Sequence, residues 1–185
     1  LEQLEPMEIL EESRQHHFEY FLALAEQGKI GLRRPAQAQW LSILKAETDN
    51  IRAALSWSLE VQIRAKLGLQ LLGTLRDFWE HTGLYMEAYQ WLERLLERAG
   101  NPDPAIQIEA LITVGYLMAW QGDFDESRRM LEASLHLCEE TGNISGRGHA
   151  LLWLPAVLPG HNFGTLIEMC EEALAIFETL DDPWG

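Results

Sequence analysis

The chain has 185 residues, of which 47% are hydrophobic and 23% are charged, a composition typical of a globular protein that can bury an apolar core. Its 29 acidic residues outnumber its 14 basic ones, and the net charge of -15 disfavours direct binding to nucleic acid or to an anionic membrane. No apolar run approaches the length of a membrane-spanning helix. We therefore expect no nucleic-acid or membrane contact, and this charge suits basic or neutral partners.

The residue composition predicts an all-α protein, because helix-favouring residues dominate and no stretch alternates apolar and polar positions as a half-buried strand would. The segment "GKIGLRRP" is expected to be a break, with Pro35 suited to the first turn of the next helix. Eight helices are expected, at about residues 7–27, 36–60, 62–82, 85–99, 104–121, 124–141, 146–158 and 164–181.

Two prolines disturb the seventh of these segments. Pro155 falls inside the expected helix and Pro159 near its end, and an interior proline removes a helical hydrogen bond. The sequence allows two interpretations of Pro155: a tolerated kink at a bend, or a distortion shaped around a ligand.

The joints between the later helices repeat along the sequence with a period of 39. The stretch "WQGDFDESRRMLEASL" aligns with "HTGLYMEAYQWLERLL" before it and with "GHNFGTLIEMCEEAL" after it. Gly83 and Gly122 occupy the turn, and an aromatic residue follows at positions 85, 124 and 163. Such periodicity predicts stacked helix pairs, with an N-terminal helix pair over residues 1–60 and about three repeats over 61–185 in one continuous solenoid.

This pattern resembles the tetratricopeptide repeat, most closely at residues 115–135, where Gly115, Gly122, Phe124, Ser127 and Leu131 occupy the expected positions. The resemblance implies a right-handed solenoid of antiparallel helix pairs. The period of 39 exceeds the usual length of that repeat, which is about 34 residues, so longer connections are expected.

The segments "HFEYFLALAEQ" and "QWLSILKAETDNIRAALSWSLE" are similar to the helical region that follows the nucleotide-binding domain in multidomain bacterial signal-transduction ATPases. Many of these regulators carry a LuxR-type DNA-binding domain. The resemblance implies a sensor region of a bacterial transcriptional regulator that controls an upstream nucleotide-binding switch. The nucleotide-binding and DNA-binding domains of the parent chain would be its intramolecular partners. The alternative is a generic scaffold for protein–protein interaction with no regulatory ligand.

No phosphate-binding loop, nucleophile elbow or HExxH motif occurs in the sequence, so no enzymatic activity, catalytic residue or cofactor is expected. His16 and His17 project about 100° apart on a helix, so they are not expected to share a metal ion. Cys138 and Cys170 favour free, buried thiols in a reducing cytoplasm, with a disulfide as the alternative.

The first helix of each stacked pair lines the concave side of such a fold. The resulting groove is expected to be acidic and aromatic, and to take a protein, a peptide or a small polar ligand that is cationic, neutral or sugar-like. Alternatively, Tyr116 and Trp120 pack between repeats. The candidate binding residues are Asp77, Glu80, His81, Glu109, Tyr116 and Trp120.

Both ends of the sequence suggest a longer parent protein. The chain opens on Leu1 instead of Met, and residues 180–185 align with 141–146, where a further repeat would begin. We therefore expect additional repeats in the parent chain and self-association through the uncovered C-terminal end. A strict monomer at high concentration would contradict this expectation.

Overall fold

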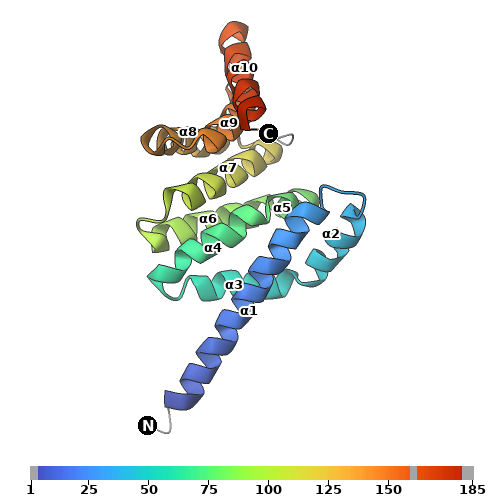
Figure 1. Cartoon of the computed structure of the whole chain (residues 1–185), viewed down its shortest axis with the longest axis vertical. Coiled ribbons are helices and arrows are strands. Elements are labelled where there is room, and N and C mark those ends of the chain that lie inside the picture. The colour runs from blue at the N-terminus through green and yellow to red at the C-terminus, as the bar shows by residue number, and fades with distance from the viewer. Residues whose placement is uncertain (1–3, 159–161, 181–185) are drawn as a thin grey trace.

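The computed structural model describes residues 4–158 and 162–180, and every regular element within these ranges is helical. The all-α class expected from the sequence is confirmed. Figure 1 shows the helices arranged roughly in chain order along the long axis of the molecule. The elements are α1 (Leu4–Gly31), α2 (Gln37–Ala46), α3 (Thr48–Ser58), α4 (Gln62–Thr74), α5 (Arg76–Thr82), α6 (Tyr85–Ala99), α7 (Pro104–Gln121), α8 (Phe124–Thr141), α9 (Ile144–Trp153), the 3-10 turn η1 (Leu154–Val157) and α10 (Phe163–Leu180).

The expected boundaries of α6, α7 and α8 agree with those observed, but two longer expected helices are each divided in two. The segments 36–60 and 62–82 bend at Glu47 and Leu75, where ψ is near zero. A threonine lies beside each bend: the Thr48 hydroxyl donates to the Lys45 carbonyl at 2.9 Å, and the Thr74 hydroxyl donates to the Gln70 carbonyl at 2.8 Å. Hydroxyls that bond to carbonyls of the preceding turn bend helices, which accounts for both divisions.

Two helix ends also differ from expectation. The first helix continues to Gly31, so that Lys29 is helical and does not belong to a break. The seventh expected helix ends as an α-helix at Trp153, and Pro155 lies in the 3-10 turn that follows. Because the α-helix stops before Pro155, the proline removes no interior α-helical hydrogen bond. Pro159 and residues 181–185, where the next repeat was expected to begin, lie outside the described residues.

Most helices pack on elements that lie within three places of them along the chain, and α4 packs mainly on α6 and α7. Helix α7 contacts α4, α6, α8 and α9, and α10 contacts α9. Helix α1 instead lies across the others and contacts α2, α3, α4 and α5, as Figure 1 shows. One apolar cluster runs from Phe18 to Met130 and therefore crosses the expected division between residues 60 and 61. The division into an N-terminal helix pair and three repeats stays a prediction.

The period found in the sequence is visible in the structure. Helices α6, α8 and α10 begin at residues 85, 124 and 163, so their starts are evenly spaced along the chain. Gly83 and Gly122 end the helices before the first two of these starts, with φ of 70° and 88° in the left-handed region that glycine adopts without strain. The buried Ser127 hydroxyl of α8 donates to the Gly115 carbonyl of α7 at 2.6 Å, which joins these two helices.

Cys138 and Cys170 are both free, so the disulfide alternative is wrong. Cys138 is buried as expected, and its burial raises the pKa of the thiol to about 11. Cys170 is exposed on α10, where the sequence predicted burial. Among residues 4–158 and 162–180 there is no helix long and apolar enough to cross a membrane.

Candidate functional site

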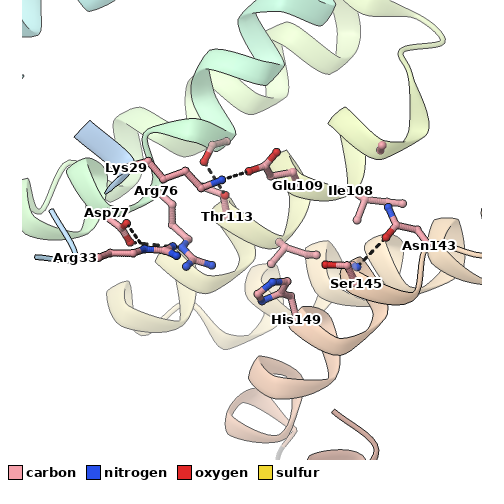
Figure 2. A pocket seen from close by; sticks show the side chains of 14 residues that line it. Lys29, Arg33, Arg76, Asp77, Ile108, Glu109, Thr113, Asn143, Ser145 and His149 are labelled. Atoms are coloured by element: carbon pink, nitrogen blue, oxygen red, sulfur yellow. Dashed lines mark hydrogen bonds and ion pairs between the residues drawn. The ribbon is translucent and has the colours of Figure 1, made fainter. Parts of the chain in front are cut away.

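A cavity of about 400 Å³ lies where the C-terminal end of α1 meets α4, α5, α7 and α9, and Figure 2 shows it from close by. Helices α4, α5, α7 and α9 fall in the segments 62–82, 104–121 and 146–158, each of which was expected to form the first helix of a pair. The volume lies in the range of small-molecule sites. The lining residues are Lys29, Arg33, Gly73, Arg76, Asp77, Ala105, Ile108, Glu109, Ile112, Thr113, Asn143, Ser145, Gly146 and His149.

Two glycines set how closely the walls of this pocket approach. A Cβ atom on Gly73 would lie 3.2 Å from the Cγ atom of Glu109, so the glycine lets α4 approach α7. A Cβ atom on Gly146 would lie 2.6 Å from the Cγ2 atom of Ile108, so α9 also approaches α7 through a glycine. The bend at Leu75 falls between Gly73 and the charged residues of α5. The pocket is therefore shaped by backbone features as well as by its side chains.

Ion pairs join the end of α1 and the loop that follows it to α5 and α7 across the pocket. Lys29 Nζ lies 2.8 Å from Glu109 Oε1 on α7, and Arg33 Nε donates to Asp77 Oδ2 on α5 at 2.8 Å. Arg76 Nε lies 3.7 Å from the other oxygen of Asp77. The Asp77 carboxylate is thus shared by two guanidinium groups, as Figure 2 shows.

Polar groups of α7 and α9 line the opposite side. The Asn143 side-chain oxygen accepts from the Gly146 backbone N–H at 2.8 Å, which caps the N-terminus of α9. The Thr113 hydroxyl donates to the Gly73 carbonyl at 3.4 Å. The His149 ring packs against Phe177 of α10, with centroids 5.0 Å apart. These groups offer hydrogen bonds to a polar ligand.

Of the six predicted binding residues, Asp77 and Glu109 line the pocket. The expected acidic character of the groove is wrong at this place, because both carboxylates are paired with basic side chains from the α1 end. The prediction considered only the helices expected to come first in each pair. It did not foresee that residues 29–33 lie against these helices.

The other four predicted residues lie outside the pocket lining. Tyr116 is 6% exposed and packs against Trp153, with ring centroids 4.4 Å apart, so it fills the space between α7 and α9. Trp120 is 60% exposed and meets the edge of Tyr116. A His81 ring nitrogen lies 2.7 Å from the Gln37 amide nitrogen. Burial, with the Glu80 side chain as the second cause, raises the pKa of the Tyr116 hydroxyl.

Arg76 connects the pocket to this aromatic cluster. Its guanidinium carbon lies 5.8 Å from the centre of the Tyr116 ring, within reach of a cation–π contact. Of the six predicted residues, Asp77 and Glu109 therefore line the pocket, and Tyr116 and Trp120 belong to the aromatic cluster. Arg76 lies between these two groups.

Sequence reasoning missed the three basic lining residues Lys29, Arg33 and Arg76. A signal existed for the first two, since "GKIGLRRP" places three basic residues within six positions of a strongly acidic chain. The segment was interpreted only as a helix break. No sequence pattern indicated Ser145 or His149 as pocket residues.

A second hollow, of about 290 Å³, runs along the exposed face of α10. Its lining residues are Phe163, Leu166, Ile167, Cys170, Glu171 and Leu174.

Among all the residues that the structure describes, no group of three or more His, Cys, Asp or Glu side chains is placed to hold a metal ion. The charged pocket is the candidate site because it combines depth with convergent polar groups.

Comparison with protein-family models, with curated proteins and with solved structures found no match for this chain. The resemblance to tetratricopeptide repeats and to bacterial signal-transduction ATPases therefore stays a prediction from the sequence.

Proposed function

We propose that this chain is the sensor region of a multidomain bacterial transcriptional regulator, built as a right-handed tetratricopeptide-like solenoid. The observation that carries the proposal is the pocket of about 400 Å³ between the end of α1 and three successive first helices. In this proposal, a small polar ligand or a partner segment binds there.

The position of the pocket supports a regulatory role. Two ion pairs from the α1 end, Lys29 with Glu109 and Arg33 with Asp77, connect the N-terminal segment to the repeats through the pocket. A ligand that replaces or strengthens these pairs binds with different affinity to a state in which the end of α1 is paired with the later helices and to a state in which it is not. Such differential affinity is what allows binding to shift a conformational equilibrium. The upstream nucleotide-binding domain of a cytoplasmic regulator would receive this shift.

The test is a thermal-shift screen of small polar compounds and short peptides against the wild-type chain and two tryptophan variants. Ser145→Trp places a large side chain in the pocket, whereas Ile144→Trp adds the same side chain at an exposed position outside the lining. We expect a stabilising compound whose effect is lost in the Ser145 variant and kept in the Ile144 variant. Equal effects in both variants would place binding elsewhere and contradict the proposal.

A generic protein-interaction scaffold is the second candidate. The observation that favours it is the exposed apolar stripe on α10, where Phe163, Ile167 and Leu174 are 82%, 55% and 59% exposed. Their spacing of three to four residues with Cys170 suits packing against another helix. Self-association through this end is the corresponding prediction. Light scattering should show a dimer that becomes monomeric with Ile167→Glu, and a strict monomer at high concentration would contradict it.

A further inference from the structure

The pocket carries a positive charge surplus in a strongly negative chain. Its lining contains Lys29, Arg33 and Arg76 against two carboxylates, Asp77 and Glu109, while the whole chain has a net charge of -15. A surplus of this sign attracts anions and repels cations in a partly enclosed site, where charges are less screened than at the open surface.

The surplus lies at one end of the pocket. Lys29 and Glu109 form a one-to-one pair at 2.8 Å, so this end is balanced. At the other end, Asp77 alone faces both Arg33 and Arg76. Their side chains are 25% and 21% exposed, and the Asp77 side chain is 11% exposed, so all three are shielded from bulk water.

The two guanidinium groups retain donors that can bind a ligand. Arg33 uses its Nε atom on Asp77, and Arg76 reaches the same carboxylate only at 3.7 Å, beyond hydrogen-bond distance. Within the described part of the chain, the terminal nitrogens of these two arginines donate no hydrogen bond that would occupy them. A guanidinium presents five N–H donors in a planar fork that matches the oxygens of a carboxylate or a phosphate.

We propose that the pocket binds a small organic anion, whose carboxylate or phosphate group is held by Arg33 and Arg76. This inference rests on the proposed sensor function and specifies its ligand class. The remainder of the ligand carries hydroxyl groups, because the polar residues Asn143 and Ser145 line the opposite side. A cationic ligand, which is one of the three kinds that the sequence favoured, would have to displace the arginines from Asp77.

The anion also has a route to the rest of the fold. Arg76 lies over Tyr116, and Tyr116 packs against Trp153, the last residue of α9. When an anion draws the Arg76 guanidinium toward itself, the contact with the Tyr116 ring changes. Binding should therefore alter tryptophan fluorescence, although no tryptophan lines the pocket.

The probes are glucose and three charged derivatives of it, namely glucosamine, gluconate and glucose 6-phosphate. Inorganic phosphate is added as a fifth probe, at constant ionic strength. Titration is followed by the ¹⁵N–¹H NMR signals of the arginine Nε groups and by tryptophan fluorescence. We expect gluconate, glucose 6-phosphate or both to shift the signals of Arg33 and Arg76, and glucosamine to leave them unchanged. The two anionic sugars distinguish a carboxylate ligand from a phosphate ligand.

The matched variants are Arg76→Gln and Arg128→Gln, which remove one positive charge each. Arg128 lies on α8, pairs with Asp125 and is absent from the pocket lining. We expect the Arg76 variant to weaken anion binding about tenfold or more, as the loss of a charge-assisted hydrogen bond predicts. The Arg128 variant should bind as the wild type does. If circular dichroism shows that the Arg76 variant is unfolded, Arg33→Gln replaces it.

Three outcomes overturn the inference. They are tighter binding of glucosamine than of the anionic sugars, an equal loss in the Arg76 and Arg128 variants, and no arginine response to any anion. A neutral or cationic compound that binds and is blocked by Ser145→Trp would overturn the anion assignment while keeping the proposed function. No pocket-dependent ligand of any charge would count against both.

Discussion

Single residues connect helices that are far apart in the sequence, and Arg52 is the clearest example outside the pocket. Its Nε and Nη2 atoms donate to the two carboxylate oxygens of Glu87 on α6, both at 2.7 Å, and Nη1 donates to Asp49 at 2.9 Å. Trp91 adds a fourth contact, from its indole nitrogen to Glu87 at 3.4 Å. Hydrogen bonding to Arg52 lowers the pKa of Glu87 below its ordinary value near 4.5.

The Arg52 pair should make stability depend on pH. Because the folded-state pKa of Glu87 is lowered, the pair contributes fully above pH 4.5, and its contribution is lost as the pH falls through the folded-state value. We expect Arg52→Gln to lower the free energy of unfolding by about 1 kcal/mol at pH 7. The difference should shrink steadily below pH 4.5. Urea unfolding of both proteins across this range measures it.

The Arg128→Gln variant is the control for this experiment, because its pair with Asp125 joins residues of a single helical turn. Its effect should stay near zero at every pH. A constant difference between Arg52→Gln and wild type at all pH values would mean that Arg52 stabilises the fold by packing alone.

Among the elements, helices α5 and α7 each end at a glycine, and the chain turns there into α6 and α8. Gly83 and Gly122 both have positive φ, and a Cβ atom added at either would have no other atom within 4 Å. Any cost of substitution there comes from the backbone conformation and not from crowding. At these two turns, the residues that repeat in the sequence also share the same left-handed backbone conformation.

Gly122→Ala should lower the free energy of unfolding by about 1 kcal/mol, because alanine is strained at a φ of 88°. Gly164→Ala is the matched control. Gly164 lies in the first turn of α10, where the nearest contact of an added Cβ would be an ordinary 3.5 Å. Alanine favours that helix by about 0.5 kcal/mol, so stability should rise. Thermal unfolding of the two variants gives the comparison, and changes of the same sign would contradict the assignment.

At the scale of the whole molecule, burial falls toward the C-terminal end. Helices α7, α8 and α10 each have 18 residues, but ten residues of α7, five of α8 and two of α10 are buried. Figure 1 shows α10 at the end of the molecule, at an angle to the other helices. Local opening costs little where few apolar contacts are lost.

Hydrogen exchange should follow this order. Because the three helices have equal length, differences in their exchange rates reflect how deeply each helix is buried and not how long it is. We expect backbone amides of α10 to exchange more than tenfold faster than those of α7, with α8 between them. Native-state exchange followed by mass spectrometry measures the order. Equal protection of α7 and α10 would show that the chain opens as a single cooperative unit, or that a second copy covers α10.

Local signals predicted much of the fold. The boundaries of α6, α7 and α8 follow from glycine, proline and aspartate at the helix ends, which act within one turn of the chain. The bends at Glu47 and Leu75 were missed because a threonine in a helix bends it only where its hydroxyl bonds to the preceding turn. The site was predicted only in part: two of the six predicted residues, Asp77 and Glu109, line the pocket, whereas Tyr116 packs between α7 and α9.

The helical class, the even spacing of the helix starts and the turns at Gly83 and Gly122 could all be predicted from the sequence, because they depend on residues close together along the chain. The charge of the pocket depends on the tertiary structure instead. Lys29 lies 80 residues from Glu109, and Arg33 lies 44 residues from Asp77. Their pairing requires α1 to lie across the later helices, and no local pattern encodes that crossing. The sequence predicted an acidic groove. The structure instead has a pocket in which two arginines, Arg33 and Arg76, face the single carboxylate of Asp77.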